Sequence, residues 1–201
     1  MSNWTAIKRD VCTEMGDAAF ANIKGGTDSE HLAALYMTFL TGGGTDATAF
    51  TRFYPIEMMA EAMHRAVKTV ISAQKKLLGK KAAPNSLNLC ATDGVNMIAY
   101  RFRNHATEAP PSLYYSTKAG TTLNRKYPDR ADGMDVPGRY SGKAVESHGK
   151  HLIVASEPST YKKEDWTLIG RNQVLLAEAD GKFEVRNVPY KKDWDVEDPY
   201  A

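Results

Sequence analysis

The sequence predicts an α+β domain in which helices come first and antiparallel strands follow. Up to about residue 78, apolar residues recur at spacings of three and four, which is typical of amphipathic helices. After Pro84 the apolar period changes to two, and short turn signals separate the apolar runs, which is typical of strands and hairpins. Helices followed by strands favour a layered α+β domain over a doubly wound sheet.

Composition sets the limits of this interpretation. The 201 residues suffice for one domain with a sizeable core, and 42% hydrophobic residues exclude a wholly disordered chain. The net charge of +2 gives no basis for nucleic-acid binding, and no apolar run approaches the roughly 20 residues of a membrane helix. Met1 to Asp10 lack the apolar core of a signal peptide, and Cys12 and Cys90 are too few for a disulfide framework. We therefore expect a cytoplasmic protein.

Three helices are expected before Pro84. The second has the clearest pattern, because one apolar stripe runs from Leu32 to Leu40 behind a capping box formed by Thr27 and Glu30. The expected helices are Trp4 to Met15, capped by Ser2-Asn3, then the helix from Thr27 to the glycines Gly42-Gly43-Gly44, and then Pro55 to Leu78, with Pro55 in the first helical position.

The second half of the chain is expected to form short strands. They are a hairpin of Leu87 to Ala91 and Met97 to Arg103 around Asp93-Gly94, a strand at Ser112 to Thr117, a buried strand at Leu152 to Ala155, and a hairpin within Gln173 to Val188 around Asp180-Gly181. Ala119 to Lys150 has little apolar pattern, and loops of this length are usually functional or mobile. Residues 1–188 are expected to form the domain, and residues 189–201 a polar tail that is acidic near its end.

No self-contained catalytic motif is present, and no cofactor is implied. His148 and His151 lie three residues apart, but the further ligands that a metal site needs are not evident, so we favour solvated loop histidines. His31 falls in the first turn of the second helix, where a surface or hydrogen-bonded role is favoured over catalysis. Tyr114 and Tyr115 alternate faces of their strand, so one is expected in the core.

Asp28 is the most informative acid in the sequence. Its spacing favours a first-turn carboxylate that is stabilised by the helix dipole, and it also fits a fixed anion that pairs with a ligand amine. Gly25-Gly26 before it allows close backbone approach. Ser156 and Glu157 follow a predicted strand, where polar groups often face a cleft, although a simple strand exit at Pro158 explains them too.

Three further residues carry open alternatives. Arg101 and Arg103 share a strand face, so they are candidates for holding a carboxylate, and solvated positions explain them equally well. Cys90 alternates with Leu89, and a small buried side chain is the expected role for a strand cysteine.

An ordered set of segments resembles a known family. The segment from Asn22 to Leu32, with Thr27-Asp28-Ser29-Glu30 at its centre, resembles class-II glutamine amidotransferases. Leu87 to Gly94, Pro110 to Ser116, and Val154 to Pro158 followed by Trp166 resemble a narrower branch, the amidotransferase-like subunit of the fungal glutathione-degradation complex. The chain is similar also to bacterial γ-glutamyl hydrolases of ergothioneine synthesis.

The resemblance implies an Ntn-hydrolase fold, an αββα sandwich, that hydrolyses a γ-glutamyl amide such as glutathione or glutamine. It implies that Asp28 binds the α-amino group of the glutamyl moiety, with Gly26, Thr27, Ser156 and Glu157 as possible pocket residues. It also implies a peptidase-like partner subunit. The family's nucleophile is an N-terminal cysteine whose own amino group can act as base, and an Asn-Gly pair stabilises the oxyanion.

The sequence departs from this family at the catalytic positions. Position 2 is Ser2, and the oxyanion Asn-Gly and the substrate-binding Arg have no counterpart, so no catalytic residue is assigned. Cys12 and Cys90 lie elsewhere in the sequence. We therefore expect a C-terminal part of the family domain that lacks the N-terminal catalytic strands. Ser2 as an N-terminal nucleophile is disfavoured, because it precedes the first helix and does not lie on the catalytic strand.

Two alternatives remain open at this point. The short chain would be a non-catalytic subunit or assembly partner if its exposed sheet edges bind another protein. An amidotransferase that delivers ammonia to a synthase is the other, although the sequence contains no synthase domain.

Overall fold

The computed structural model describes residues 1–43, 47–119, 150–160 and 162–197. The α-helices are α1 (Trp4–Thr13), α2 (Asp17–Ala21), α3 (Asp28–Thr41) and α4 (Ile56–Leu78), and the short 3₁₀ helices are η1 (Ala47–Phe50), η2 (Gly79–Lys81), η5 (Lys163–Asp165) and η6 (Lys192–Trp194). The strands are β1 (Ser86–Thr92), β2 (Met97–Arg103), β3 (Tyr114–Ser116), β4 (Ile153–Ala155), β5 (Thr167–Leu168), β6 (Gln173–Ala177) and β7 (Phe183–Asn187).

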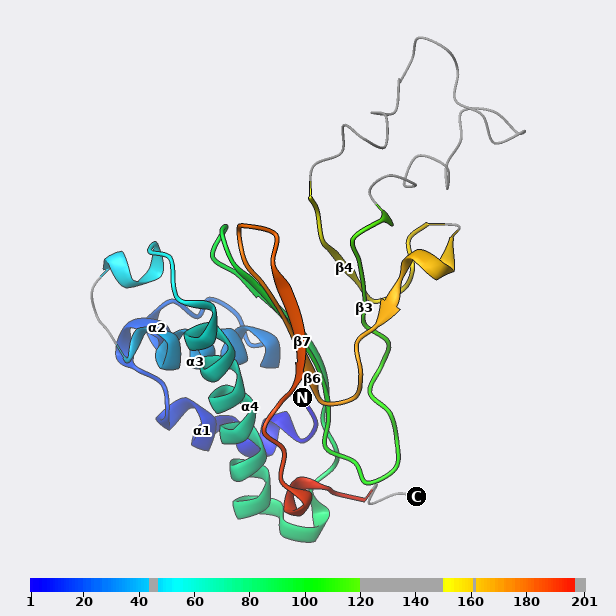
Figure 1. Ribbon diagram of the computed structural model, residues 1–201. Coiled ribbons are helices and arrows are strands. Elements are labelled where there is room, and N and C mark those ends of the chain that lie inside the picture. The colour runs from blue at the N-terminus through cyan, green and yellow to red at the C-terminus, as the bar shows by residue number, and fades with distance from the viewer. Residues whose placement is uncertain (44–46, 120–149, 161, 198–201) are drawn as a thin grey trace, which may run out of the picture.

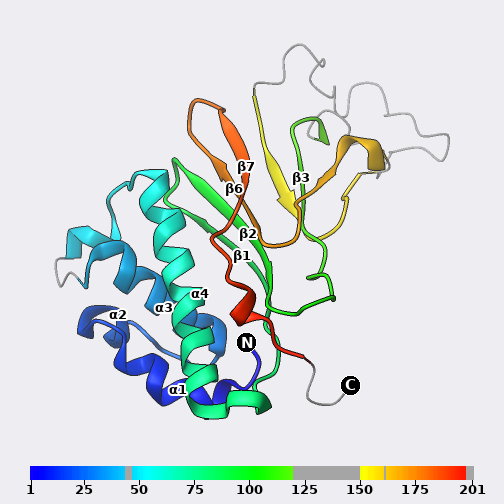
Figure 2. The ribbon, with the colours of Figure 1, turned by 60° about the horizontal axis from the view of Figure 1, so that its bottom comes forward.

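Helices cover one face of a four-stranded antiparallel sheet with the strand order β1-β2-β6-β7 (Figures 1 and 2). Alternate residues of the central strands point into this layer, including Tyr100 and Phe102 of β2 and Val174 of β6. They pack with the apolar face of α4, where Val67 and Ile71 are almost fully buried. The apolar residues of the helical pattern and those of the strand pattern are therefore buried in one core.

The opposite face of the sheet has a smaller core. Ala99 of β2 and Leu175 of β6 are fully buried there, together with Leu113 and Ile169. A second antiparallel sheet, with the order β4-β3-β5, contributes side chains such as Val154 to this cluster. The mixed arrangement of helices and antiparallel sheets confirms the α+β prediction.

The helix predictions are confirmed in position and corrected at their ends. Asn3 is the residue before α1, but its φ of 56° is left-handed and its side chain caps no helix amide. The side-chain Oδ1 of Asn3 instead accepts a hydrogen bond from the amide of Ala83 at 2.8 Å. Pro55 precedes α4 and is not its first residue, and α2 was not predicted because five residues show no period.

Both predicted hairpins are confirmed, and three predictions about burial on the strands are corrected. The β4 strand is only half-buried, because it pairs with β3 on one side and forms an edge. Cys90 is exposed, because it points to the less covered face of the edge strand β1. Neither Tyr114 nor Tyr115 is fully buried, although Tyr115 contacts Phe183 edge to face.

The predicted long loop and the predicted carboxyl-terminal tail are described to different extents. The long loop from Ala119 to Lys150 falls almost entirely outside the described residues. Within the segment expected to be a polar tail, Trp194 is 6% exposed and stacks on His64 of α4, and Tyr190 contacts Phe102. This part of the chain therefore packs on the sheet and on α4. Among the described helices, none combines the length and apolar character needed to span a bilayer.

Candidate functional site

The amino-terminal end of α3 carries the segment that contains Asp28. Thr27 precedes the helix, and its hydroxyl accepts a hydrogen bond from the amide of Glu30 at 3.3 Å. Asp28 is the first helical residue, and its carboxylate accepts a hydrogen bond from the amide of Ser29 at 2.8 Å. Its other carboxylate oxygen pairs with the α-ammonium group of Met1. The structure therefore shows an α-ammonium group bound at Asp28.

Electrostatics keep Asp28 ionised. The hydrogen bond from the Met1 ammonium group lowers the pKa of this carboxyl, and the amide and hydroxyl of Ser29 lower it further against the opposing effect of burial. The helix dipole acts in the same direction, since a negative charge is stabilised near a helix amino terminus. The result is a fixed anion at the end of α3.

The predicted capping box forms only in part. The Glu30 side chain does not return to the amide of Thr27 but accepts hydrogen bonds from the amides of Lys24 at 2.7 Å and Gly25 at 2.8 Å. A β-carbon on Gly25 would lie 2.7 Å from the Glu30 carboxylate, whereas one on Gly26 would meet no atom within 4 Å. Gly25 thus permits the approach that ties the loop before Asp28 to α3.

A buried amide cluster fixes the residues next to Met1. The amide of Ser2 donates to Asn85 at 3.0 Å, and its carbonyl accepts from Gln74 at 2.7 Å. The Asn85 side chain in turn donates to Gln74 at 2.6 Å. The Ser2 hydroxyl donates to the carbonyl of Pro84 at 2.6 Å, so it is held in a structural hydrogen bond.

Ser156 and Glu157 lie in a different cluster. Both are exposed after β4, and the Ser112 hydroxyl donates to the Glu157 carboxylate. The Asn88 side chain donates to the Ser112 carbonyl at 2.7 Å, and its own carbonyl oxygen is buried without a partner among the described residues. The structure thus brings Gly26, Thr27 and Asp28 together, and no described hydrogen bond joins them to Glu157.

The two predicted arginines serve the fold. Arg101 is buried and donates hydrogen bonds to the carbonyls of Pro110, Pro111 and Ile169 at 2.7 to 2.8 Å. Burial lowers its pKa. Arg103 pairs with Glu108, so it does hold a carboxylate, but one from its own loop.

The predicted histidine and cysteine positions are structural or separate from Asp28. His31 is 3% exposed, and its Nδ1 donates to the carbonyl of Thr27 at 2.7 Å, which confirms a hydrogen-bonded role. Cys12 and Cys90 are both free thiols, on α1 and β1 respectively. Within the described ranges no three His, Cys, Asp or Glu residues cluster to hold a metal, and His148 lies outside them.

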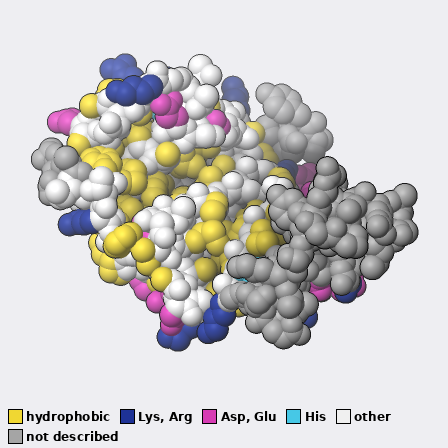
Figure 3. Space-filling model, turned by 90° about the horizontal axis from the view of Figure 1, so that it is seen from above, with side chains coloured by type: hydrophobic (Ala, Val, Ile, Leu, Met, Phe, Trp, Pro, Cys, Tyr) yellow, Lys and Arg dark blue, Asp and Glu magenta, His cyan; other side chains and the backbone are white. Residues whose placement is uncertain are grey.

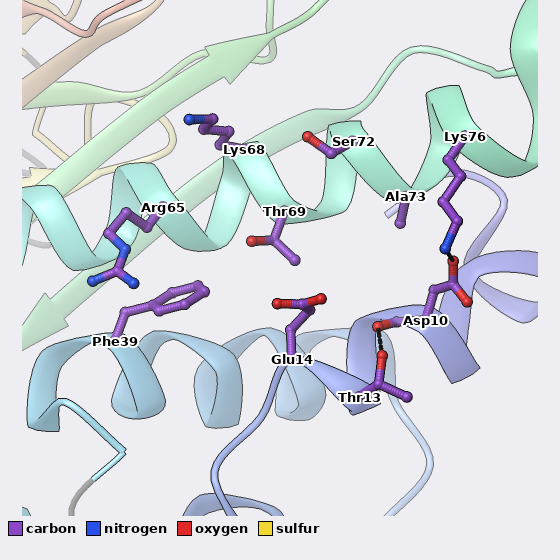
Figure 4. Close-up of a pocket in the computed structure, with 10 residues that line it drawn as sticks. All are labelled: Asp10, Thr13, Glu14, Phe39, Arg65, Lys68, Thr69, Ser72, Ala73 and Lys76. Atoms are coloured by element: carbon purple, nitrogen blue, oxygen red, sulfur yellow. Dashed lines mark hydrogen bonds and ion pairs between the residues drawn. The ribbon is translucent and has the colours of Figure 1, made fainter.

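A hollow of about 380 Å³ between α1, α3 and α4 lies apart from the Asp28 segment (Figure 4). Asp10 and Lys76 bridge it with an ion pair of 2.9 Å, and the Arg65 guanidinium lies 4.2 Å from the centre of the Phe39 ring. These pairings satisfy much of its charge internally. Seen from above, hydrophobic side chains gather in a shallow hollow of the described surface (Figure 3).

Comparison with known proteins links this geometry to a family. "Probable glutamine amidotransferase DUG3" of Saccharomyces cerevisiae is 27% identical over 177 residues, which are 87% of this chain and 46% of that protein. A solved glutamine aminotransferase class-II domain protein from Silicibacter pomeroyi matches with a TM-score of 0.58 over 93% of this chain and 63% of that one. The resemblance to class-II glutamine amidotransferases is confirmed.

Sequence identity and coverage limit what the comparisons show for this amidotransferase-like chain. The structural match has 18% sequence identity and therefore shows the fold. The chain spans about half the length of the curated relative that it matches. No protein-family profile matches it.

Sequence reasoning missed two sets of contacts in this amidotransferase-like fold, those that hold Ser2 next to Met1 and those that hold Glu157. The partners Gln74 and Asn85 are buried amides far from Ser2 in sequence. The sequence holds one local sign of this cluster: Gln74 is a polar residue on the otherwise apolar, buried face of α4. The Ser112–Glu157 pair carries no local signal at all.

Proposed function

We propose that this chain carries the glutamyl-binding part of a class-II amidotransferase-like γ-glutamyl amide hydrolase, with a partial Ntn-hydrolase sandwich as its fold. Glutathione is the proposed substrate, and glutamine is the related alternative. The observation that supports this most is the ion pair between the Asp28 carboxylate and an α-ammonium group. A glutamyl moiety presents the same group.

Asp28 would act by orientation. A charge-assisted hydrogen bond from the substrate ammonium to the carboxylate fixes one end of the glutamyl chain. The γ-amide carbonyl is then held at a fixed distance from the amino-terminal end of α3. Glu30 supports this geometry through the amides of residues 24 and 25, which hold the loop before Asp28. Asp28 is therefore assigned to binding and not to bond cleavage.

Cleavage requires a nucleophile that this sequence does not contain at the family position. In the family an N-terminal cysteine attacks the amide carbonyl, forms a glutamyl thioester and releases the amine, and water then hydrolyses the thioester. Position 2 here is Ser2, and its hydroxyl donates a hydrogen bond to the Pro84 carbonyl. The proposal therefore assigns no catalytic residue within these 201 residues.

The binding role is tested by titrating glutathione and glutamine into the protein by calorimetry. Asp28→Asn keeps the side-chain shape and removes the charge, so affinity should fall roughly tenfold or more. Asp17→Asn, in the exposed first turn of α2, removes the same charge elsewhere and serves as the matched control. Equal affinities for the wild type and Asp28→Asn would refute the assignment.

A second titration uses the bound ammonium group. Acetylation of the Met1 α-amino group removes its positive charge and should free Asp28, so glutathione should bind more tightly to the acetylated chain. Tighter binding to the acetylated Asp28→Asn variant as well would contradict this reasoning.

A non-catalytic assembly role is the second candidate. It is favoured by β1, which among the described strands pairs only with β2 and exposes Cys90 on the less covered face. Free strand edges favour association. Light scattering with size-exclusion chromatography, with and without a peptidase-like partner subunit, tests this role, and a stable monomer that ignores the partner would count against it.

A further inference from the structure

A cavity of about 550 Å³ lies between α1 and the segment that leads from α2 into α3. Lys8, Arg9 and Cys12 line it from α1, where spacings of one, three and four residues place them on one side of the helix. Phe20 and Ile23 line it from the α2 segment. Asp28 is not among its lining residues, so the cavity is separate from the ammonium site.

The charge in this cavity is positive and uncompensated. Neither Lys8 nor Arg9 forms an ion pair with a carboxylate in the described part of the chain. The nearby acids are engaged elsewhere, because Asp10 pairs with Lys76 and Glu30 accepts hydrogen bonds from two backbone amides. An anion entering the cavity would therefore meet two cations without displacing an internal partner.

The other surfaces of the cavity are apolar or carry a vacant acceptor. Phe20 is 51% exposed, which is unusual for a large aromatic side chain, and Ile23 is half-buried beside it. His31 is 97% buried, and its Nδ1 must carry the proton because the Thr27 carbonyl can only accept. In the neutral ring, Nε2 is then an acceptor, and it has no hydrogen-bond partner among the described residues.

We propose that this cavity binds a small organic carboxylate with an aromatic or branched apolar body. The guanidinium of Arg9 and the ammonium of Lys8 would hold the carboxylate, since an arginine fork matches a carboxylate in two hydrogen bonds. The apolar body would cover Phe20 and Ile23. A hydroxyl on that body would donate to Nε2 of His31.

The test uses 3-(4-hydroxyphenyl)propanoate as the probe, titrated by calorimetry. Saturable binding at millimolar concentration is expected, and the neutral amide of the probe and inorganic phosphate should each bind much more weakly. In the double variant Lys8→Gln/Arg9→Gln, affinity should fall roughly tenfold or more. The matched double variant Arg65→Gln/Lys68→Gln removes two cations from α4 and should bind like the wild type.

Cys12 provides an independent readout, because it lines the cavity while Cys90 lies on β1. The probe should slow alkylation of Cys12 by N-ethylmaleimide and leave Cys90 unchanged, as read by peptide mass. The proposal is overturned by an absence of saturable binding, by equal binding of the amide, or by a double variant within about twofold of the wild type. Equal protection of both thiols would also overturn it.

Discussion

The buried amide cluster at Asn85 permits a quantitative prediction. Asn85 is fully buried and Gln74 is 1% exposed, so water cannot replace their lost partners. Substitution Asn85→Ala removes the donor to Gln74 at 2.6 Å and the acceptor for the Ser2 amide at 3.0 Å. The backbone hydrogen bond from Asn85 to Asn104 stays, because it does not involve the Asn85 side chain.

The magnitude follows from the two groups that lose their partners. Each buried polar atom without a partner costs about 1–3 kcal/mol, and the Ser2 amide is partly accessible, so the total should be about 3 kcal/mol. That is a large part of the 5–15 kcal/mol that typically separates a folded domain from its unfolded state. Asn85→Ala should therefore lower the urea midpoint clearly.

Urea unfolding followed by circular dichroism measures this change at constant temperature. The matched control is Asn22→Ala, since Asn22 is exposed and its side chain makes one hydrogen bond, to the carbonyl of Ala18 at 2.9 Å. Its cost should be at most about 0.5 kcal/mol. A loss below about 1 kcal/mol for Asn85→Ala, with an unchanged slope, would refute the reasoning.

Three further outcomes follow from contacts described above. Gly25→Ala should cost about 1 kcal/mol in urea unfolding, because the new β-carbon displaces the Glu30 carboxylate from two amides, whereas Gly26→Ala should be nearly neutral; equal costs would argue against the contact. Burial lowers the pKa of His64 below that of an exposed histidine, so the folded state favours the neutral ring; the stability this provides is complete above the ordinary histidine pKa and is lost as pH falls toward the lowered one. His64→Gln should flatten this decline in thermal midpoint, and an unchanged slope would contradict the reasoning. Arg101→Lys should lower stability by roughly 1–3 kcal/mol in denaturant titration, because one ammonium cannot reach all three carbonyls, and a neutral result would show that the carbonyls find other partners.

Local periodicity predicted what depends on local chemistry. The stripe from Leu32 to Leu40 and the alternation around Tyr100 each reflect burial of one side of an element, and each is confirmed. Thr27 was likewise predictable as a cap, because its contact with Glu30 spans three residues. Each of these patterns involves residues that are only a few positions apart in the sequence.

Contacts between distant segments could not be predicted in this way. Arg101 was left between a ligand role and solvent, because the carbonyls that it binds belong to residues 110, 111 and 169. Cys90 was expected to be buried, but burial on β1 depends on what covers the second face of the sheet. The binding role of Asp28 stays a prediction, whereas its ion pair with the Met1 ammonium group and the amide cluster at Ser2 required the tertiary structure.

The placement of the three tryptophans gives each part of the fold its own optical reporter. Trp4 on α1 lies edge-on to His31, Trp166 before β5 donates to Thr160 at 2.9 Å, and Trp194 stacks on a histidine of α4. Single-tryptophan versions, with phenylalanine at the other two positions, would let fluorescence follow the helical layer, the small sheet and the carboxyl-terminal segment separately. Coincident transitions at all three would establish cooperative unfolding.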